Sequence, residues 1–262
     1  MSEDISNAIQ GLPSLFVEIL QKHMYVMSPE GCGGLRIFHG TKLVTFWEAV
    51  RQAYRSEEPP YWGWAWPGSI ALSRYLVDHP ETVRGCRVLD LGAGNALTSL
   101  AAKQAGAAHC IANDIDPLAM YMAAAHQRLN GLDIELLEQN LLADDPAAIE
   151  CDVILVGDMF YERQLAGTLK PWLQRACALD RIVLIGEPGR NYPPEGRTQE
   201  LATYTLQVSL ELENASSRKL KVLGWVPIPN GHDSTAYCRL MNRKDGPEIF
   251  TAWILLVQLA SR

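Results

Sequence analysis

The chain has 262 residues, of which 48% are hydrophobic, and its formal net charge is −7. This length and apolar content predict one large α/β domain with a full core. Because affinity for nucleic acid comes largely from basic surface and counterion release, the negative charge argues against a nucleic-acid partner.

The cysteines, the histidines and the N-terminal segment bear on disulfides, metal sites and cellular location. The six cysteines are scattered without a CxxC pair and the histidines lack ligand spacing, so we expect reduced core thiols and no metal. The N-terminus has early acids and no basic region before its apolar stretch, and the apolar run at 249–260 is too short to span a bilayer. We therefore expect no membrane association, and a cytoplasmic location in a bacterium or the mitochondrial matrix in a eukaryote.

Three zones follow one another along the chain. Residues 1–60 show helical spacing over 14–24 and 45–54 and end in the turn-like SEEPP, which predicts an N-terminal helical extension. Residues 61–229 form the predicted main domain. Residues 230–262 form a C-terminal extension to which the sequence assigns no role.

Within the main domain, short β-like runs alternate with helical stretches. The runs RVLDLG, HCIAND, IELLEQN, DVILVGD and RIVLIGE are accompanied by helical patterns at 95–105, 117–130 and 162–178. This alternation predicts a parallel sheet with helices on both faces. After Pro194, two alternating runs, TYTLQVSLELE and KLKVLGWVPI, predict an antiparallel hairpin.

The stretch RVLDLGAGNALTSLAAKQAG at 87–106 predicts a strand, a glycine turn and a helix. Ligands of open α/β sheets bind at the carboxyl ends of the strands, and the first strand–helix turn is the usual floor of that site. Asp90, Gly92 and Gly94 lie in this turn. Asp114 ends the next strand, where an acid accepts hydrogen bonds from ribose hydroxyls. These features fit NAD as well as S-adenosylmethionine.

Two features favour S-adenosylmethionine over NAD. Leu97 stands where the dinucleotide fingerprint has its third glycine. Asp90 would place negative charge beside a diphosphate, whereas beside the ammonium of a methionyl group it is favourable. The helix N-terminus at Asn95 suits the methionyl carboxylate. The alternative that the glycines merely make a tight turn stays open.

A second motif, ILVGDMFY at 154–161, places Asp158 just past the fourth strand, with Phe160 and Tyr161 beside it. This is the sheet edge of the cofactor turn, where a methyl acceptor should bind. The motif lacks the paired prolines of the Asn/Asp-Pro-Pro-Tyr/Phe element of amino methyltransferases, so a nucleobase acceptor is disfavoured. The alternative is that Asp158 caps the following helix.

Five stretches carry a family resemblance, and they occur in this order: PPYWGWAWPGSIALSRYLVDHP, VLDLGAGNALTSLAAKQAGA, ANDIDPLAM, GDMFYERQLAGTLKPWL and IGEPGRNY. Together they resemble the seven-β-strand lysine methyltransferases that modify the β subunit of electron transfer flavoprotein, over roughly residues 35–226. The resemblance implies a Rossmann-like class I methyltransferase fold with a central, mostly parallel seven-stranded sheet. It also implies S-adenosylmethionine as cofactor and the flavoprotein β subunit as partner.

The resemblance assigns roles position by position. It implies contacts with the cofactor for Trp66, Asp90, Gly92, Gly94, Asn95, Asp114, Ile115 and Asn140. Asp158 and Tyr161 match the acid and aromatic of the family's Asp-x-x-Tyr/Phe motif and are the implied catalytic residues. On the substrate side we expect Phe160, Glu187 and Arg190, although Glu187 stands where the family commonly has aspartate. Trp62 and Trp64 alternate with Trp66, which predicts one face of an extended segment, and we assign the first two to core packing.

These residues suggest a mechanism. A lysine amine must lose its proton before attack, because its reference pKa is about 10.4. We expect Asp158 to orient the amine, and Trp66, Phe160 and Tyr161 to desolvate it. The alternatives are a class I methyltransferase acting on a ribosomal protein or a small molecule, an NAD-dependent oxidoreductase, and a non-catalytic cofactor-binding module. Oligomeric state is not predicted.

Overall fold

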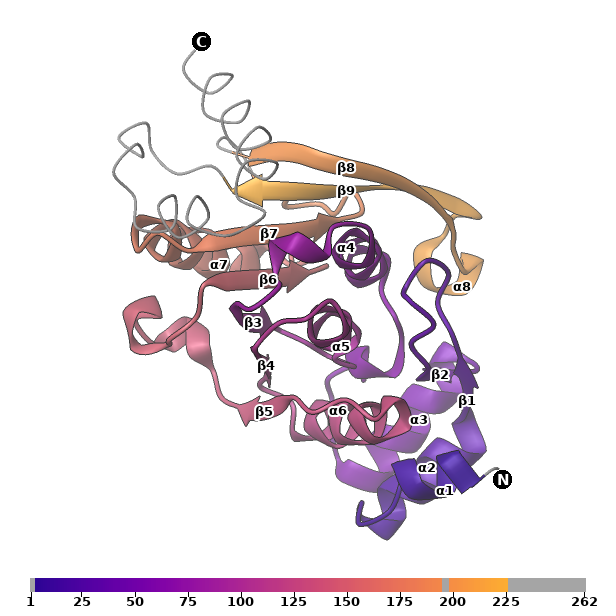
Figure 1. The fold of residues 1–262 in the computed structure, drawn as a ribbon. Coiled ribbons are helices and arrows are strands. Elements are labelled where there is room, and N and C mark those ends of the chain that lie inside the picture. Colours follow the sequence, from indigo (N-terminus) through magenta and orange to yellow (C-terminus); the bar gives the residue numbers. More distant parts are fainter. Residues whose placement is uncertain (1–2, 195–197, 226–262) are drawn as a thin grey trace.

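The computed structural model describes residues 3–194 and 198–225, and its centre is a seven-stranded sheet in the order β5-β4-β3-β6-β7-β9-β8 (Figure 1). The strands are β3 (Arg87–Leu91), β4 (His109–Asp114), β5 (Glu135–Glu138), β6 (Val153–Gly157), β7 (Ile182–Glu187), β8 (Thr198–Gln207) and β9 (Ser217–Trp225). Strands β3 to β7 are parallel, and β9 runs antiparallel between β7 and β8. The expected mostly parallel sheet with a C-terminal antiparallel hairpin is confirmed.

Helices cover both faces of this sheet. They are α4 (Pro67–Asp78), α5 (Leu97–Gln104), α6 (Pro117–Asn130) and α7 (Arg163–Ala178), with short 3-10 turns at Tyr61–Gly63, Pro80–Thr82, Leu141–Ala143 and Pro146–Ala148. Helices α4, α5 and α6 lie on one face and α7 on the other (Figure 1). Alternate strand residues serve the two faces: Val88 packs with α4 and α5, whereas Leu89 and Leu91 pack with α7.

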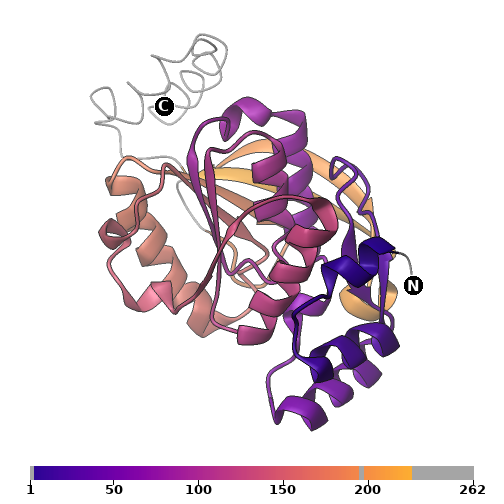
Figure 2. The same ribbon diagram turned by 60° about the horizontal axis from the view of Figure 1, so that its bottom comes forward.

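The N-terminal region packs against α6, and its indigo and purple segments lie together in both views (Figures 1 and 2). It contains α1 (Glu3–Ala8), α2 (Ser14–His23), β1 (Met24–Met27), β2 (Ile37–Gly40) and α3 (Leu43–Tyr54). Strands β1 and β2 pair antiparallel, a hairpin that the helical expectation for residues 1–60 did not include. The domain boundary at residue 60 stays a prediction.

Three local expectations are corrected or fall outside the structure. Residues 203–213 are not one strand, because β8 ends at Gln207 and a short helix, α8 (Leu210–Glu213), precedes β9. The tryptophan segment is not extended throughout, because a 3-10 turn spans Tyr61–Gly63. Trp62 and Trp64 are each 2% exposed, as expected of core residues. The predicted C-terminal extension, 230–262, lies outside the described residues.

The described part of the chain bears on two further expectations. Its five cysteines are free and buried, in agreement with reduced core thiols. Within the same residues, the helices are too short or too polar to cross a membrane.

Candidate active site

A cavity of about 800 Å³ lies at the carboxyl edge of the sheet. Its wall is built by the turn after β3, the end of β4, the loops after β5 and β6, and residues 56–69. It brings together most of the residues that the sequence singled out: Trp66, Gly92, Gly94, Asn95, Asp114, Ile115, Asn140, Asp158, Tyr161 and Arg190. This edge includes β3 and β6, where the strand order reverses, which is the usual ligand position in open α/β sheets.

The glycine turn after β3 has a geometry that needs its glycines. Gly92 and Gly94 have φ angles of +66° and +53°, in the left-handed region that side chains disfavour. A Cβ atom on Gly92 would also lie 2.5 Å from the sulfur of Met159. The turn is therefore held tightly between β4 and the loop after β6.

Asp114 joins that turn to the end of β4. Its Oδ2 accepts a hydrogen bond from the Gly94 N–H at 2.8 Å, and its Oδ1 accepts one from the Asp116 N–H at 3.1 Å. The Ile115 N–H also favours the ionised carboxylate, and since a carboxylate has about four acceptor sites, one remains for a further donor such as a ribose hydroxyl. Ile115 is 69% exposed beside it, and with Asn140 it lines the same part of the cavity.

Asp90 does not line the cavity, which corrects the expectation that it meets a cofactor ammonium. The residue is 2% exposed, and its Oδ2 accepts hydrogen bonds from the Ser99 N–H and Oγ–H at 2.9 and 2.6 Å. Burial raises the pKa of this carboxyl to about 7, against the lowering effect of the Ser99 hydrogen bonds. Asp90 therefore ties β3 to α5 beneath the glycine turn.

Asn95 lines the cavity but does not begin the helix. Helix α5 begins at Leu97, after Ala96 in the left-handed region at φ +59°. The Asn95 side chain donates to the Trp64 carbonyl at 2.9 Å and accepts from the Leu97 N–H at 3.2 Å. The helix N-terminus expected at Asn95 is thus two residues later, and Asn95 anchors the tryptophan segment to the turn.

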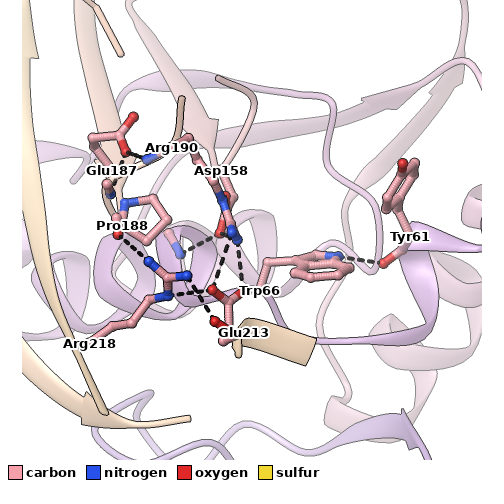
Figure 3. Close-up of polar contacts among 10 residues, drawn as sticks. Tyr61, Trp66, Asp158, Glu187, Pro188, Arg190, Glu213 and Arg218 are labelled. Carbon is pink, nitrogen blue, oxygen red and sulfur yellow. Dashed lines mark hydrogen bonds and ion pairs between the residues drawn. The ribbon is translucent and has the colours of Figure 1, made fainter. Parts of the chain in front are cut away.

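Asp158 stands at the end of β6 with an unusual backbone, at φ +66°. Its Oδ2 accepts a hydrogen bond from the Gly68 N–H at 2.9 Å, in the first turn of α4. The Arg190 guanidinium contacts both carboxylate oxygens, from Nε to Oδ1 and from Nη2 to Oδ2, the latter at 3.0 Å (Figure 3). Burial raises the pKa of Asp158, whereas Arg190 and the Gly68 N–H favour its ionised form. The expectation that Asp158 caps the next helix is not met, since α7 has no side-chain cap.

Arg190 is part of a chain of alternating charges. It also donates from Nη2 and Nη1 to the two carboxylate oxygens of Glu213, at 2.8 and 3.2 Å. Arg218 pairs with the same Glu213 at 2.5 Å and donates to its backbone carbonyl (Figure 3). Since its three guanidinium nitrogens serve these carboxylates, the structure makes Arg190 a partner of Asp158 and not a free substrate ligand. The sequence offered no signal for Glu213 or Arg218.

Two expected substrate residues lie elsewhere. Phe160 is fully buried and packs in the core on the α7 face of the sheet. Glu187 is 6% exposed, and its Oε1 accepts from the Gly189 and Arg190 N–H groups, both at 2.6 Å. Burial raises the pKa of Glu187. Both residues therefore shape the loops behind the cavity, which corrects the roles expected for them.

Tyr61 supplies an aromatic ring that the sequence did not single out. Its ring centroid lies 5.3 Å from that of Tyr161 and 6.0 Å from that of Trp66, and all three residues line the cavity. The Trp66 indole N–H donates to the Tyr61 carbonyl at 2.7 Å, and the Arg190 guanidinium lies 5.8 Å from the Trp66 ring. The three rings therefore line the same cavity as Asp158.

Known proteins resemble this chain over most of its length. The electron transfer flavoprotein beta subunit lysine methyltransferase of Rattus norvegicus is 43% identical over 161 residues, 59% of this chain and 62% of that relative. The Xenopus laevis protein of the same name is 41% identical over 66% of this chain and 72% of its own. The Danio rerio protein of the same name is 37% identical over 69% of this chain and 70% of its own. The chain therefore spans less than two thirds of the rat relative's length.

Two further likenesses concern the fold and its cofactor half. The family model for ribosomal protein L11 methyltransferase (PrmA) matches residues 72–157, which end one residue before Asp158. A solved Streptococcus mutans structure, classed with the SAM-dependent methyltransferases, superposes with a TM-score of 0.51 at 12% identity, over 77% of this chain and 55% of that one. At that identity the likeness bears on the fold alone.

Proposed function

Because the chain belongs to the family of electron transfer flavoprotein beta subunit lysine methyltransferases, we propose that it methylates lysine side chains of that flavoprotein subunit, using S-adenosylmethionine. The relatives' names suggest the acceptor. The cavity supports the chemistry, because residues suited to the cofactor and to a lysine share one wall.

The cavity residues fit S-adenosylmethionine. The glycine turn exposes backbone beside the cavity, and the Asp114 carboxylate keeps an acceptor site for a ribose hydroxyl beside its backbone hydrogen bonds. Ile115 offers an exposed apolar surface for the adenine, with Asn140 nearby. Leu97 is fully buried in the core, where a dinucleotide fingerprint has glycine. When bound, the cofactor supplies an electrophilic methyl group on a sulfonium.

The chain's own task is to present a neutral amine in the right direction. A positioned nucleophile in a water-excluded cavity gains on the order of 7–11 kcal/mol over the free reactants. Asp158 has one lone pair left on Oδ1, which suits an amine N–H. Arg190 offsets the negative charge of this carboxylate. Asp158 can therefore orient the amine without strongly raising the pKa of the amine. Loss of that proton to solvent precedes attack.

One observation carries the proposal: Asp158 is fixed by Gly68 and Arg190 in the cavity that Asp114 and the glycine turn also line. The test is transfer of labelled methyl from S-adenosylmethionine to purified flavoprotein, with ribosomal protein L11 as the competing acceptor. We expect label on lysines of the β subunit, located by mass spectrometry. Label on L11 alone, or none on either protein from a chain that binds the cofactor, would refute the acceptor proposed.

A further inference from the structure

The mouth of the cavity carries a pair of exposed tyrosine rings. Tyr61 is 41% exposed and Tyr161 is 40% exposed, although their centroids lie only 5.3 Å apart. Large aromatic side chains usually bury most of their surface, so two half-exposed rings in contact at a cavity are informative. Tyr61 comes from the turn before α4, whereas Tyr161 follows Asp158 on the loop after β6.

Charge around these rings favours a cation. Burial raises the pKa of both hydroxyls, and Glu58 and Glu162 raise each of them further, so both rings stay neutral phenols. Among the described residues, the cavity wall holds five acids (Glu58, Asp114, Asp116, Asp158 and Glu162) and a single basic side chain, Arg190. Arg190 is already paired with Asp158 and Glu213. An anionic ligand such as a phosphate would meet net repulsion here.

The rings connect this mouth to the candidate reacting group. The Trp66 indole N–H donates to the Tyr61 carbonyl, the Arg190 guanidinium lies over the Trp66 ring, and Arg190 contacts Asp158. Figure 3 shows the Trp66 indole between Tyr61 and the Asp158–Arg190 pair. A long side chain that enters over the rings therefore leads toward Asp158.

We propose that Tyr61 is a specificity-determining residue that binds the alkylammonium side chain of the acceptor, together with Tyr161. The inference rests on the function proposed above and adds a residue to it. The methylenes of a lysine pack on the ring faces, and its cationic end is attracted by the ring quadrupoles and the surrounding carboxylates. Tyr61 thus takes the place that the sequence assigned to Phe160.

The test measures binding of a small cation, so it does not depend on methyl transfer. The probe is n-butyltrimethylammonium, titrated by NMR into the full chain with S-adenosylhomocysteine present, and pentanoate is the probe of opposite charge. The variants are Tyr61→Ala, Tyr61→Phe, which keeps the ring, and Tyr61→Leu, which keeps apolar bulk if the alanine variant does not fold. The matched control is Tyr25→Ala, because Tyr25 is also exposed, at 48%, but lies on β1 and outside the cavity.

We expect the wild-type chain to bind the cation and not pentanoate. Tyr61→Ala and Tyr61→Leu should lower the affinity for the cation about tenfold. Tyr61→Phe and Tyr25→Ala should stay within twofold, with the affinity for S-adenosylhomocysteine unchanged throughout. The inference is overturned by a wild-type chain that does not bind the cation, by unchanged cation binding in Tyr61→Ala or Tyr61→Leu, or by an equal loss of S-adenosylhomocysteine binding. Cation binding through Tyr61 without flavoprotein methylation would refute only the acceptor.

Discussion

Asp158 is held by residues from two other parts of the chain. The Gly68 N–H belongs to the first turn of α4, and a helix N-terminus favours a negative charge. Arg190, in the turn after β7, binds the carboxylate with two nitrogens, which is the strong geometry for this pair. A Cβ on Gly68 would lie 2.8 Å from the Asp158 nitrogen, so the close approach needs glycine there. The same two contacts therefore position Asp158 and favour its ionised form, against the effect of burial on its pKa.

Whether a cavity residue could be predicted from the sequence depended on whether the direction of its side chain follows from the strand pattern. Asp114, the last residue of β4, and Asp158, just past β6, reach the cavity because the carboxyl ends of parallel strands share one edge. Asp90 lies one position earlier than the end of β3, between two leucines that face α7, so strand alternation directs it toward α5. That alternation was readable in the sequence. The burial of Phe160 depends on the path of the loop and was not.

The buried Asp90 carboxyl gives a pH dependence of stability. Its pKa rises from 3.8 to about 7 on folding, so the folded chain keeps a proton that the unfolded chain releases between those pH values. The stability that Asp90 contributes is present below pH 4 and is lost as pH rises toward 7. We expect Asp90→Asn to gain stability relative to wild type across this window, by on the order of 4 kcal/mol at most.

The measurement is urea unfolding of Asp90→Asn and wild type at pH values from 4 to 8. Comparison with wild type cancels the opposite trend from His126, whose pKa burial lowers to about 4. Asp133→Asn is the control, because Asp133 is exposed. A stability difference that stays constant with pH would contradict the assignment.

At the scale of elements, α8 is the unexpected part of the site. Its sequence, LELE, continues the alternation of β8, and this pattern predicts a strand there. The structure instead turns the chain at Asn214, in the left-handed region at φ +49°, and leads into β9. From this helix the Glu213 carboxylate accepts a hydrogen bond from Arg190, and the Glu211 carboxylate accepts one from the Leu43 N–H at the start of α3, at 2.9 Å. Four residues thus join the hairpin, the site and the N-terminal region.

The charge chain through α8 predicts a non-additive mutant pair. Glu213→Gln leaves Arg218 without its carboxylate partner and Arg190 with Asp158 alone, so we expect a loss of about 3 kcal/mol. The double variant Glu213→Gln/Arg218→Gln removes one charge of each sign and keeps the Asp158–Arg190 pair, so it should be more stable than the single variant.

Urea unfolding of the single and double variants checks this prediction. Glu200→Gln is the control on the same hairpin, since its ion pair with Lys221 is 44–48% exposed and contributes little. A double variant less stable than Glu213→Gln would show that Arg218 acts independently of the pair.

At the scale of the whole molecule, the N-terminal region is connected to the cofactor turn through one buried histidine. His126 of α6 accepts a hydrogen bond on Nε2 from the Phe38 N–H of β2, and its Nδ1 donates to the Asn95 carbonyl, both at 2.8 Å. Trp62 adds a second connection, because its ring lies 5.4 Å from those of Phe16 and Phe46 in the N-terminal region and its indole N–H donates to Asp116 at 2.9 Å. Residues before position 61 therefore support the site as well as extend the fold.

The main sheet could be predicted because its strands are apolar runs that alternate with amphipathic helices. Strands β1 and β2 have four residues each, too few to show a period, so the hairpin was missed. Contacts such as His126 with Asn95 join residues far apart in the chain, and local pattern carries no information on them. The glycine turn together with the family resemblance predicted the cofactor, and the resemblance suggested the proposed acceptor, whereas the pairing of Asp158 with Arg190 needed the structure.

The most direct test of the account compares Asp158→Asn with wild type in single-turnover methyl transfer to the flavoprotein β subunit, at saturating S-adenosylmethionine. Cofactor affinity is measured in parallel by calorimetry, with Asp133→Asn as the control. We predict a loss of turnover on the order of 100-fold at a temperature where both chains are folded, because the amine loses its orienting carboxylate, with cofactor affinity nearly unchanged. The variant should also be less stable than wild type, because Arg190 loses a charged partner. Turnover within a few-fold of wild type, or a loss that follows the cofactor affinity, would contradict the role of Asp158.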